Sequence, residues 1–465
     1  MTKFHFSAQI ESQSYRSIKM DRKRKLESTE VEVSGDYLMR NDQLKNQEID
    51  SLIGADDYKI LQENIENGKI KDINVPINDH TNKSMLMKAC EVGSIECVKV
   101  LLFNKADVNY TDKYSVVSYA AASGSIDLLT LIIARDELNV DLLYNTLHQH
   151  LSTSHLQLSI EIVKLLVSRL PDVNRRVHWE YILLNDAISG GYLDIIKLLL
   201  EAGANPCVTD LNGFDALEVS TRKGRLDAMM LLFESSSPHS YNITIRSINK
   251  AYLCACYCGV IDIVRYLIGK GATVDMIEEG EDGCHAFDHT INDYTRKPNI
   301  TLANLLIDSG FDVNTIYLKR SALYFACIHE RMEHVQLLLD SGSDPNLRYP
   351  DGSSLLLDLV LDTTKMRTDY TEYITLLFDF GANANIAYEH SGDTALMIAV
   401  TRYRVTVNIN LVKLLLERGA DVTQVNKEGK SVLDMLGRTR KYGEVRELYT
   451  KYIDRNKAGA KYVLK

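Results

Sequence analysis

Short apolar blocks recur along this chain at regular distances. Residues 190–206 read GGYLDIIKLLLEAGANP, and closely related blocks stand at 92–109, 258–275 and 407–423. Within each block the apolar residues follow the i, i+3/i+4 spacing of one helix face. A glycine such as Gly203 then favours the left-handed conformation that ends a helix. Each block is therefore predicted to be a short amphipathic helix with a fixed end.

A second, shorter helix precedes each of these blocks, and the residue before it keeps the period. These anchor positions are Ser84, Ser115, Asn145, Ile182, Asp215, Lys250, Cys284, Ser321, Ser354, Thr394 and Ser431. A period of about 33 residues is typical of proteins that stack one helix pair per repeat. The pattern therefore predicts a solenoid of stacked repeats rather than a single globular core.

Each repeat carries the residues that a stacked helix pair needs. Hydroxyl side chains that can cap the first helix stand at Ser84, Ser321, Thr394 and Ser431. Leucines expected to point into the stack follow at Leu86, Leu147, Leu217, Leu323, Leu396 and Leu433. Glycines that can end the first helix are Gly93, Gly124, Gly191, Gly224 and Gly259. The buried stripe of a second helix is exemplified by Ile195, Leu198 and Leu199. One such pair has too little core to fold alone, so neighbouring repeats must bury one another.

The pattern divides the chain into three parts. Residues 1–56 carry mixed charges without a sustained apolar period, which predicts a mobile leader. The array is placed at 57–455, with about eleven repeats that include a degenerate first repeat and a terminal cap. Residues 456–465 are a short tail.

Four repeats contain extra residues between their two helices. The inserts read STSHLQLS, NDYTRKPN, TTKMRTDYTE and TRYRVTVNIN. Longer loops are tolerated, because each doubling of loop length costs only about 0.6 kcal/mol. The inserts are interpreted either as neutral drift or as a second contact surface.

These features resemble the ankyrin repeat. The family signature is T-P-L-H-x-A-A-x-x-G, followed by x-V-x-x-L-L-x-x-G-A-D-x-N, and LLLEAGANP and LLLERGADV match its second part closely. The first part is weaker: Thr394 and Ser321 open its nearest versions, and His148 keeps the signature histidine. Since that Thr and His link repeats in the family, the resemblance implies individually weaker repeats here. It also implies an all-α solenoid with short finger loops that binds another protein on its concave face and finger loops.

The resemblance implies which residues face that partner. In ankyrin proteins, certain positions of the first helix line the concave face. At these positions, apolar side chains cluster between 219 and 329, beside two basic residues. The candidate partner-binding residues are Val219, Arg222, Lys223, Tyr257, Ile291, Phe325 and Ile328. An apolar patch rimmed by charge is typical of an interaction site. The alternative is that repeats of shifted register bury these side chains.

The resemblance also implies a modification. In ankyrin proteins, an asparagine after the second helix can be hydroxylated by an asparaginyl hydroxylase that favours a leucine several residues upstream. Asn109, Asn314 and Asn346 stand in this context. The alternative is that they are unmodified, turn-forming residues.

Composition and charge narrow the classes of function. The formal net charge is −10 at pH 7, so broad attraction to nucleic acid or an anionic membrane is not expected. No apolar run approaches the about 20 residues that span a bilayer. Eight scattered cysteines indicate reduced thiols and a soluble protein of the cytoplasm or nucleus. No phosphate-binding loop or nucleophile motif is present. A non-enzymatic protein without a cofactor is therefore predicted.

Two clusters of metal-ligand residue types are interpreted as structural. The first is formed by Cys254, Cys256 and Cys258. Cys256 falls on a small core position and no second cysteine pair lies nearby, so core packing is preferred to half of a zinc site. The second consists of His148, His150 and His155, with metal binding or pH sensing as the alternative.

These features predict a protein–protein interaction scaffold, monomeric outside its complex, that binds neither nucleic acid nor membrane. Two alternatives stay open. One is a substrate adaptor for a ubiquitin ligase or another enzyme. The other is a nuclear regulator that masks a transcription factor, for which the basic tract at 22–25 would be an import signal rather than a solvated run.

Overall fold

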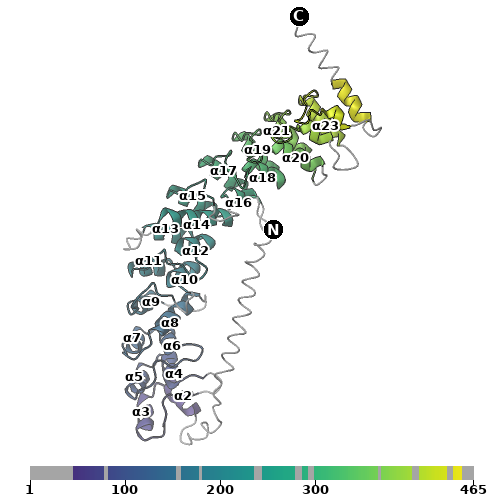
Figure 1. Ribbon diagram of the computed structural model, residues 1–465. Coiled ribbons are helices and arrows are strands. Elements are labelled where there is room, and N and C mark those ends of the chain that lie inside the picture. The colour runs from purple at the N-terminus through teal and green to yellow at the C-terminus, as the bar shows by residue number, and fades with distance from the viewer. Residues whose placement is uncertain are drawn as a thin grey trace. The chain divides into compact units, whose positions relative to one another are not determined.

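The computed structural model describes most of the chain beyond its first 45 residues. The described ranges are 46–77, 82–152, 159–176, 181–234, 243–277, 285–291, 298–364, 368–400, 408–436 and 443–452. Contacts divide the chain into two compact units between Asp186 and Ala187, and each unit is described by itself. Both consist of successive helix pairs (Figure 1), which confirms the predicted all-α solenoid.

In the N-terminal unit the helices alternate between two layers (Figure 1). The first helices of the pairs are α2 (Asn46–Gly54), α4 (Met85–Val92), α6 (Val116–Ala122) and α8 (Asp141–Ser152). The second helices are α3 (Tyr58–Glu66), α5 (Ile95–Phe103), α7 (Ile126–Ile133) and α9 (Ile160–Val167). Each helix packs on its neighbours in the same layer, as α4 does on α2 and α6, and α5 on α3 and α7. The core is thus shared between adjacent repeats.

The C-terminal unit continues the same alternation. Its first helices are α12 (Ala216–Arg222), α14 (Ile245–Cys258), α16 (Asp288–Ile291), α18 (Ala322–Ile328), α20 (Leu355–Thr364), α22 (Ala395–Val400) and α24 (Val432–Leu436), and α10 (Leu183–Gly190) crosses the boundary. Its second helices are α11 (Leu193–Glu201), α13 (Leu226–Glu234), α15 (Ile261–Gly269), α17 (Ile300–Asp308), α19 (Met332–Asp340), α21 (Thr371–Asp379) and α23 (Ile409–Glu417). A helix over 443–452 follows them and buries Val445 and Tyr449.

Short finger hairpins precede the first helices. The most regular one pairs β1 (Ile316–Tyr317) antiparallel with β2 (Arg320–Ser321). Single antiparallel bridges occupy the same place elsewhere, as between Thr111 and Ser115 and between Val425 and Ser431. The predicted finger loops are therefore present between repeats.

The predicted caps form in the structure. The hydroxyl oxygen of Ser84 accepts a hydrogen bond of 3.2 Å from the backbone N–H of Met87, and that of Thr394 accepts one of 3.3 Å from Met397. Ser321 and Ser431 make the same contact at the starts of α18 and α24. A cap of this kind contributes about 1 kcal/mol to helix stability.

The predicted glycine ends of the first helices adopt the left-handed conformation. Their φ angles lie between 63° and 80°, at Gly93, Gly124, Gly191, Gly224 and Gly259. Glu330 occupies the same position after α18, with φ of 59°. This conformation is less favourable for a residue with a side chain than for glycine. The position therefore requires a left-handed residue whether or not glycine occupies it.

Two predicted helix starts are wrong. Asn145 lies inside α8, which begins at Asp141, and Lys250 lies inside α14, which begins at Ile245. The cap of α14 is Thr244, whose hydroxyl accepts from the N–H of Ser247. These helices are longer than the repeat signature allows, because each extends past the anchor toward its N-terminus.

Three other predictions of placement need correction. Leu433 is 42% exposed, and α24 buries Val432 and Leu436 instead. The buried stripe of α11 is Ile196, Leu199 and Leu200, so the predicted stripe residues Ile195 and Leu198 are only half-buried.

The predicted domain boundary at residue 57 is also wrong. Ile49 and Ile53 of α2 are 4% and 0% exposed, because α2 packs on α3 and α4. The array therefore begins by Asn46. Residues 1–45 and 453–465, with the tract at 22–25, lie outside the described residues.

Candidate protein-binding surfaces

The predicted binding residues lie on first helices of the C-terminal unit. We define the helix-one face as the side of this unit formed by α12, α14, α16 and α18, each of which packs on the next in the chain. Tyr257 of α14 is 50% exposed, and its ring meets that of His289 edge-on at 5.5 Å. Phe325 and Ile328 of α18 are half-buried. The exposed Arg222 and Lys223 stand at the end of α12.

Two predicted contact residues are not on the surface. Ile291, the last residue of the four-residue helix α16, is 0% exposed. Val219 is 8% exposed where α12 packs along α14. The expectation that both are exposed is therefore wrong. Tyr257, Phe325 and Ile328 are the apolar candidates that remain accessible.

Phe325 is held in place by the finger in front of it. Its ring stacks on Tyr317 of β1, with centroids 5.2 Å apart. The Tyr317 hydroxyl donates a hydrogen bond to the carboxylate of Asp288 on α16. Burial raises the pKa of Asp288 to about 6, although the bonds from Tyr317 and the His285 N–H favour its charged form. The finger and two successive first helices thus form one connected assembly.

A second network joins the next two repeats. Arg320 donates to Asp351 at 2.8 Å and lies 3.3 Å from Asp358 of α20. Its guanidinium also lies over the rings of Tyr324 and Tyr349, at 5.1 and 4.7 Å from their centroids. Burial opposes the charged form of Asp351, but the hydrogen bonds from Ser353, followed by the contact with Arg320, lower the pKa of Asp351 to about 2. These contacts position the α18 repeat against its neighbour, a role that the Thr–His link has in the signature.

The three predicted hydroxylation residues form a ladder between consecutive fingers. Asn314 accepts from the N–H of Asp344 at 2.7 Å and donates to the carbonyl of Gly342 at 3.2 Å. Asn109 makes the equivalent bonds to Asn139 and Glu137, and Asn346 makes them to Asn383 and Gly381. Asn385 has the same pair of bonds, to Asp421 and Gly419. Sequence reasoning missed Asn385, although it follows a second helix at the same distance as Asn346.

Comparison with known families accounts for this arrangement. The family described as ankyrin repeats (3 copies) matches residues 52–146 and 184–278. The single ankyrin repeat matches residues 319–349 and 391–427, so the matches cover more than half of the chain. The chain belongs to the ankyrin repeat family. Repeats of this family bind other proteins, which places the chain in the protein–protein interaction class.

Its relatives are ankyrin proteins of different kinds. The E3 ubiquitin-protein ligase KEG of Arabidopsis thaliana is 24% identical over 369 residues, which are 76% of this chain and 22% of that protein. The B-cell lymphoma 3 protein homolog of Mus musculus is 25% identical over 33% of this chain and 34% of its own length. Ankyrin repeat and SOCS box protein 6 of Homo sapiens is 33% identical over 28% of this chain and 31% of its own length. The chain thus spans about a third or less of each.

The signature histidine of the ankyrin repeat has a different partner in this chain. His148 lies with its Nδ1 2.7 Å from the Asp186 carboxylate, and its ring stacks on Tyr181 at 3.8 Å. Burial raises the pKa of Asp186, whereas the bond with His148 opposes this. His150 is buried and donates from Nδ1 to the carbonyl of Thr146 at 2.6 Å. Its pKa is lowered by burial. His155 lies outside the described residues.

The alternating cysteines of the ankyrin repeat at α14 are partly buried. Cys256 is 1% exposed in the core, and Cys254 and Cys258 are half-buried on the adjoining face. Among the described residues, no group of three His, Cys, Asp or Glu side chains is placed to hold a metal ion. Helices long and apolar enough to cross a membrane are likewise absent from the described part of the chain. Three of the four inserts fall largely outside the described residues, whereas only 365–367 of the insert TTKMRTDYTE do so.

Proposed function

We propose that this ankyrin array is a non-enzymatic scaffold that binds a protein partner on the helix-one face of its C-terminal unit. The observation that carries the proposal is the half exposure of Tyr257, a large side chain on a first helix that the neighbouring His289 ring covers only in part. Phe325 and Ile328 supply further apolar surface two first helices away, and Arg222 and Lys223 add charge at one end. Aromatic side chains rimmed by charged ones carry most of the energy of many interfaces.

Contacts among the side chains of this surface hold it in place before a partner binds. Phe325 is stacked on Tyr317, which is itself tied to Asp288, so little side-chain freedom remains to be lost on binding. The net charge of −10 favours a protein partner over nucleic acid, and we propose that the chain is monomeric outside its complex and acts in the cytoplasm.

The test is capture of partners by the full chain and its variants. The double variant Tyr257→Ala/Phe325→Ala should weaken binding of a captured partner by about 2 kcal/mol or more. These two aromatic side chains are the largest accessible apolar ones of the site. Titration calorimetry with that partner gives the number, and circular dichroism shows whether the fold is kept. Met230→Ala on α13 is the matched control, because Met230 is 38% exposed on a second helix. Unchanged binding by a folded double variant would refute the proposed site.

A substrate adaptor is the second candidate, and the identity of two relatives favours it. One relative is an E3 ubiquitin-protein ligase, and another carries a SOCS box. Quantitative mass spectrometry of the captured proteins separates the two roles. Ubiquitin-ligase subunits enriched together with a second protein would assign the adaptor role. Transcription factors enriched from nuclear extract would assign the nuclear regulator instead.

We also propose that Asn109, Asn314 and Asn346 are hydroxylated in cells. Each side chain is engaged in the ladder between fingers, so a hydroxylase must open a finger locally to reach it. Peptide mass spectra of protein from its native source should show one added oxygen on these asparagines. Spectra that cover all three sites without the added mass would contradict the proposal.

A further inference from the structure

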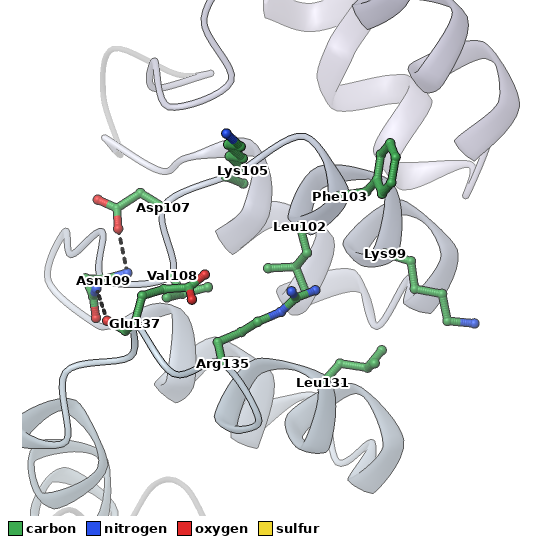
Figure 2. A pocket seen from close by; sticks show the side chains of 11 residues that line it. Lys99, Leu102, Phe103, Lys105, Asp107, Val108, Asn109, Leu131, Arg135 and Glu137 are labelled. Carbon is green, nitrogen blue, oxygen red and sulfur yellow. Dashed lines mark hydrogen bonds between the residues drawn. The ribbon is translucent and has the colours of Figure 1, made fainter.

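A groove in the N-terminal unit lies apart from the helix-one face. It opens between the C-terminal ends of the second helices α5 and α7 and the turns that follow them (Figure 2). Its volume is about 770 Å³, within the range of 300–1,000 Å³ that is usual for ligand pockets. Leu102 and Val108 are buried beneath it and Leu131 is half-buried at its side, while Phe103 stands at its rim.

Phe103 departs from the other repeats of the same chain. It is the last residue of α5 and is 80% exposed. The residue at this position in most other repeats is acidic, namely Glu201, Asp308, Asp340, Asp379 and Glu417. A carboxylate there is solvated, and that of Asp379 pairs with Arg418 at 2.6 Å, whereas Phe103 exposes a large apolar ring. The substitution therefore adds apolar surface to this groove and removes a negative charge from it.

Lys105 is a second departure in the same groove. Its φ is 64°, in the left-handed region that favours glycine. Glycine occupies the equivalent position elsewhere, at Gly203, Gly271, Gly310, Gly342, Gly381 and Gly419. A lysine here costs stability that glycine would not, and such strain is concentrated at functional sites. Two neighbouring positions thus differ from the chain's own pattern, and both side chains line one cavity.

The charges of the groove favour an anionic ligand. Within the described residues, no carboxylate forms an ion pair with Lys105 or Arg135, whereas Lys99 pairs with Glu96 at 2.7 Å. The Asp107 carboxylate is occupied, since it accepts from the backbone N–H of Asn109 at 2.8 Å (Figure 2). The two free cations lie beside an apolar floor and an exposed ring.

We propose that this groove binds a short acidic peptide segment of a protein partner, and that one large apolar side chain of the segment packs on Phe103. Carboxylates of the segment pair with Lys105 and Arg135. A peptide fits better than a nucleic acid, because Asp107 and Glu137 at one end of the groove repel the evenly spaced phosphates of a nucleic acid, whereas a peptide can place its few carboxylates beside Lys105 and Arg135 alone. The site is separate from the helix-one face, so neither proposal depends on the other.

A random peptide phage library panned against the full-length chain supplies the probe. Enriched peptides should combine Asp or Glu with Phe, Leu, Ile or Met. Their synthetic forms are then titrated by fluorescence anisotropy into the wild type and into Phe103→Glu/Lys105→Gly. The double variant restores the chain's own pattern, so it should fold normally and bind these peptides at least about tenfold more weakly. Affinity for the wild type should fall as salt is added.

The control is Asp308→Glu. It places a glutamate at the position of another repeat that corresponds to Phe103, and it should leave the affinity for the peptides unchanged. Peptides that bind the double variant as tightly as the wild type would overturn the proposal. So would groove-dependent peptides that are basic or lack apolar residues. Binding of a single-stranded oligonucleotide that is lost in the double variant, with no peptide behaving this way, would assign the groove to nucleic acid instead.

Discussion

Asp215 illustrates how a buried cap changes the acid chemistry of a repeat. Its carboxylate caps α12 by accepting from the N–H of Glu218 at 3.0 Å, and Lys250 pairs with Glu218 at 2.8 Å beside it. Burial is the main cause that raises the pKa of Asp215 from 3.8 to about 6. The folded chain therefore holds this proton at pH values where the unfolded chain has released it.

This difference predicts a pH-dependent stability at residue 215. Below about pH 4 both states are protonated, and between about pH 4 and 6 the folded state binds more protons, so stability falls as pH rises through this window. Asp215→Asn keeps the cap without a titrating group. At pH 7 the variant should be more stable than the wild type by about 1–3 kcal/mol. Urea midpoints at pH 7 and pH 4.5 provide the measurement.

Comparing the wild type with Asp215→Asn also cancels the effect of the buried histidines on the pH dependence of stability. That effect is opposite in sign to the effect of Asp215. Burial lowers the pKa of His285 and His334, so their contribution to stability is lost as pH falls below 6.5. Both proteins share these groups, and the difference between them reports Asp215. A gap that stays constant between pH 4.5 and 7 would show that the Asp215 carboxyl has an ordinary pKa in the folded chain.

At the scale of single elements, α18 is followed by a residue with a strained backbone. Glu330 adopts φ of 59° where five other first helices end in glycine. Glu330→Gly should raise the free energy of unfolding by about 0.5–1 kcal/mol, because glycine adopts this conformation without strain. Thermal melting followed by circular dichroism measures the change.

Gly124→Ala is the matched control for that element. Gly124 has φ of 75°, and an added Cβ would meet no other atom within 4 Å. The loss of stability in this variant would therefore come from backbone strain alone. If Glu330→Gly destabilises the chain while Gly124→Ala behaves as expected, Glu330 makes a favourable contact that outweighs its strain.

Element lengths explain which features the sequence predicts and which it does not. Caps such as Ser84 and ends such as Gly93 are local signals, and their geometry follows from two or three neighbouring residues. The early start of α14 has a local signal in its cap Thr244, but this cap lies outside the repeat period. The single turn of α16 depends on packing between repeats and carries no local signal, so the period alone does not predict that Ile291 is buried.

The candidate sites divide in the same way. The exposure of Tyr257 follows from its position in the repeat signature, which the sequence provides. Phe103 and Lys105 carry no signal in the family signature. They differ only from the residues at the same positions of the other repeats in this chain, a difference that the sequence alone contains.

At the scale of the whole molecule, the division at Asp186 predicts how the chain unfolds. Each repeat contacts its neighbours in the sequence, so stability should be lost regionally rather than in one transition. Leu101 and Leu199 are 0% and 1% exposed, in the N-terminal and C-terminal units respectively. Replacing either leucine by alanine should cost about 2–5 kcal/mol. Hydrogen exchange should then speed up mainly in the unit that carries the substitution.

Each of these two variants serves as the control for the other. Equal acceleration of exchange in both units by Leu101→Ala would mean that the whole array opens as a single body. Uniform protection from residue 80 to residue 450 in the unmodified chain would lead to the same conclusion.

The reactivity of the buried thiols depends on whether the repeat that contains them is folded. Burial raises the pKa of Cys97 to about 11 and that of Cys256 to about 12, and it raises the pKa of Cys90 and Cys327 as well. Almost no thiolate is present at neutral pH, so alkylating reagents and peroxide should spare these residues while the array is closed. A repeat that opens exposes its thiol at an ordinary pKa. Oxidative damage in a cell would therefore be recorded where a repeat opens.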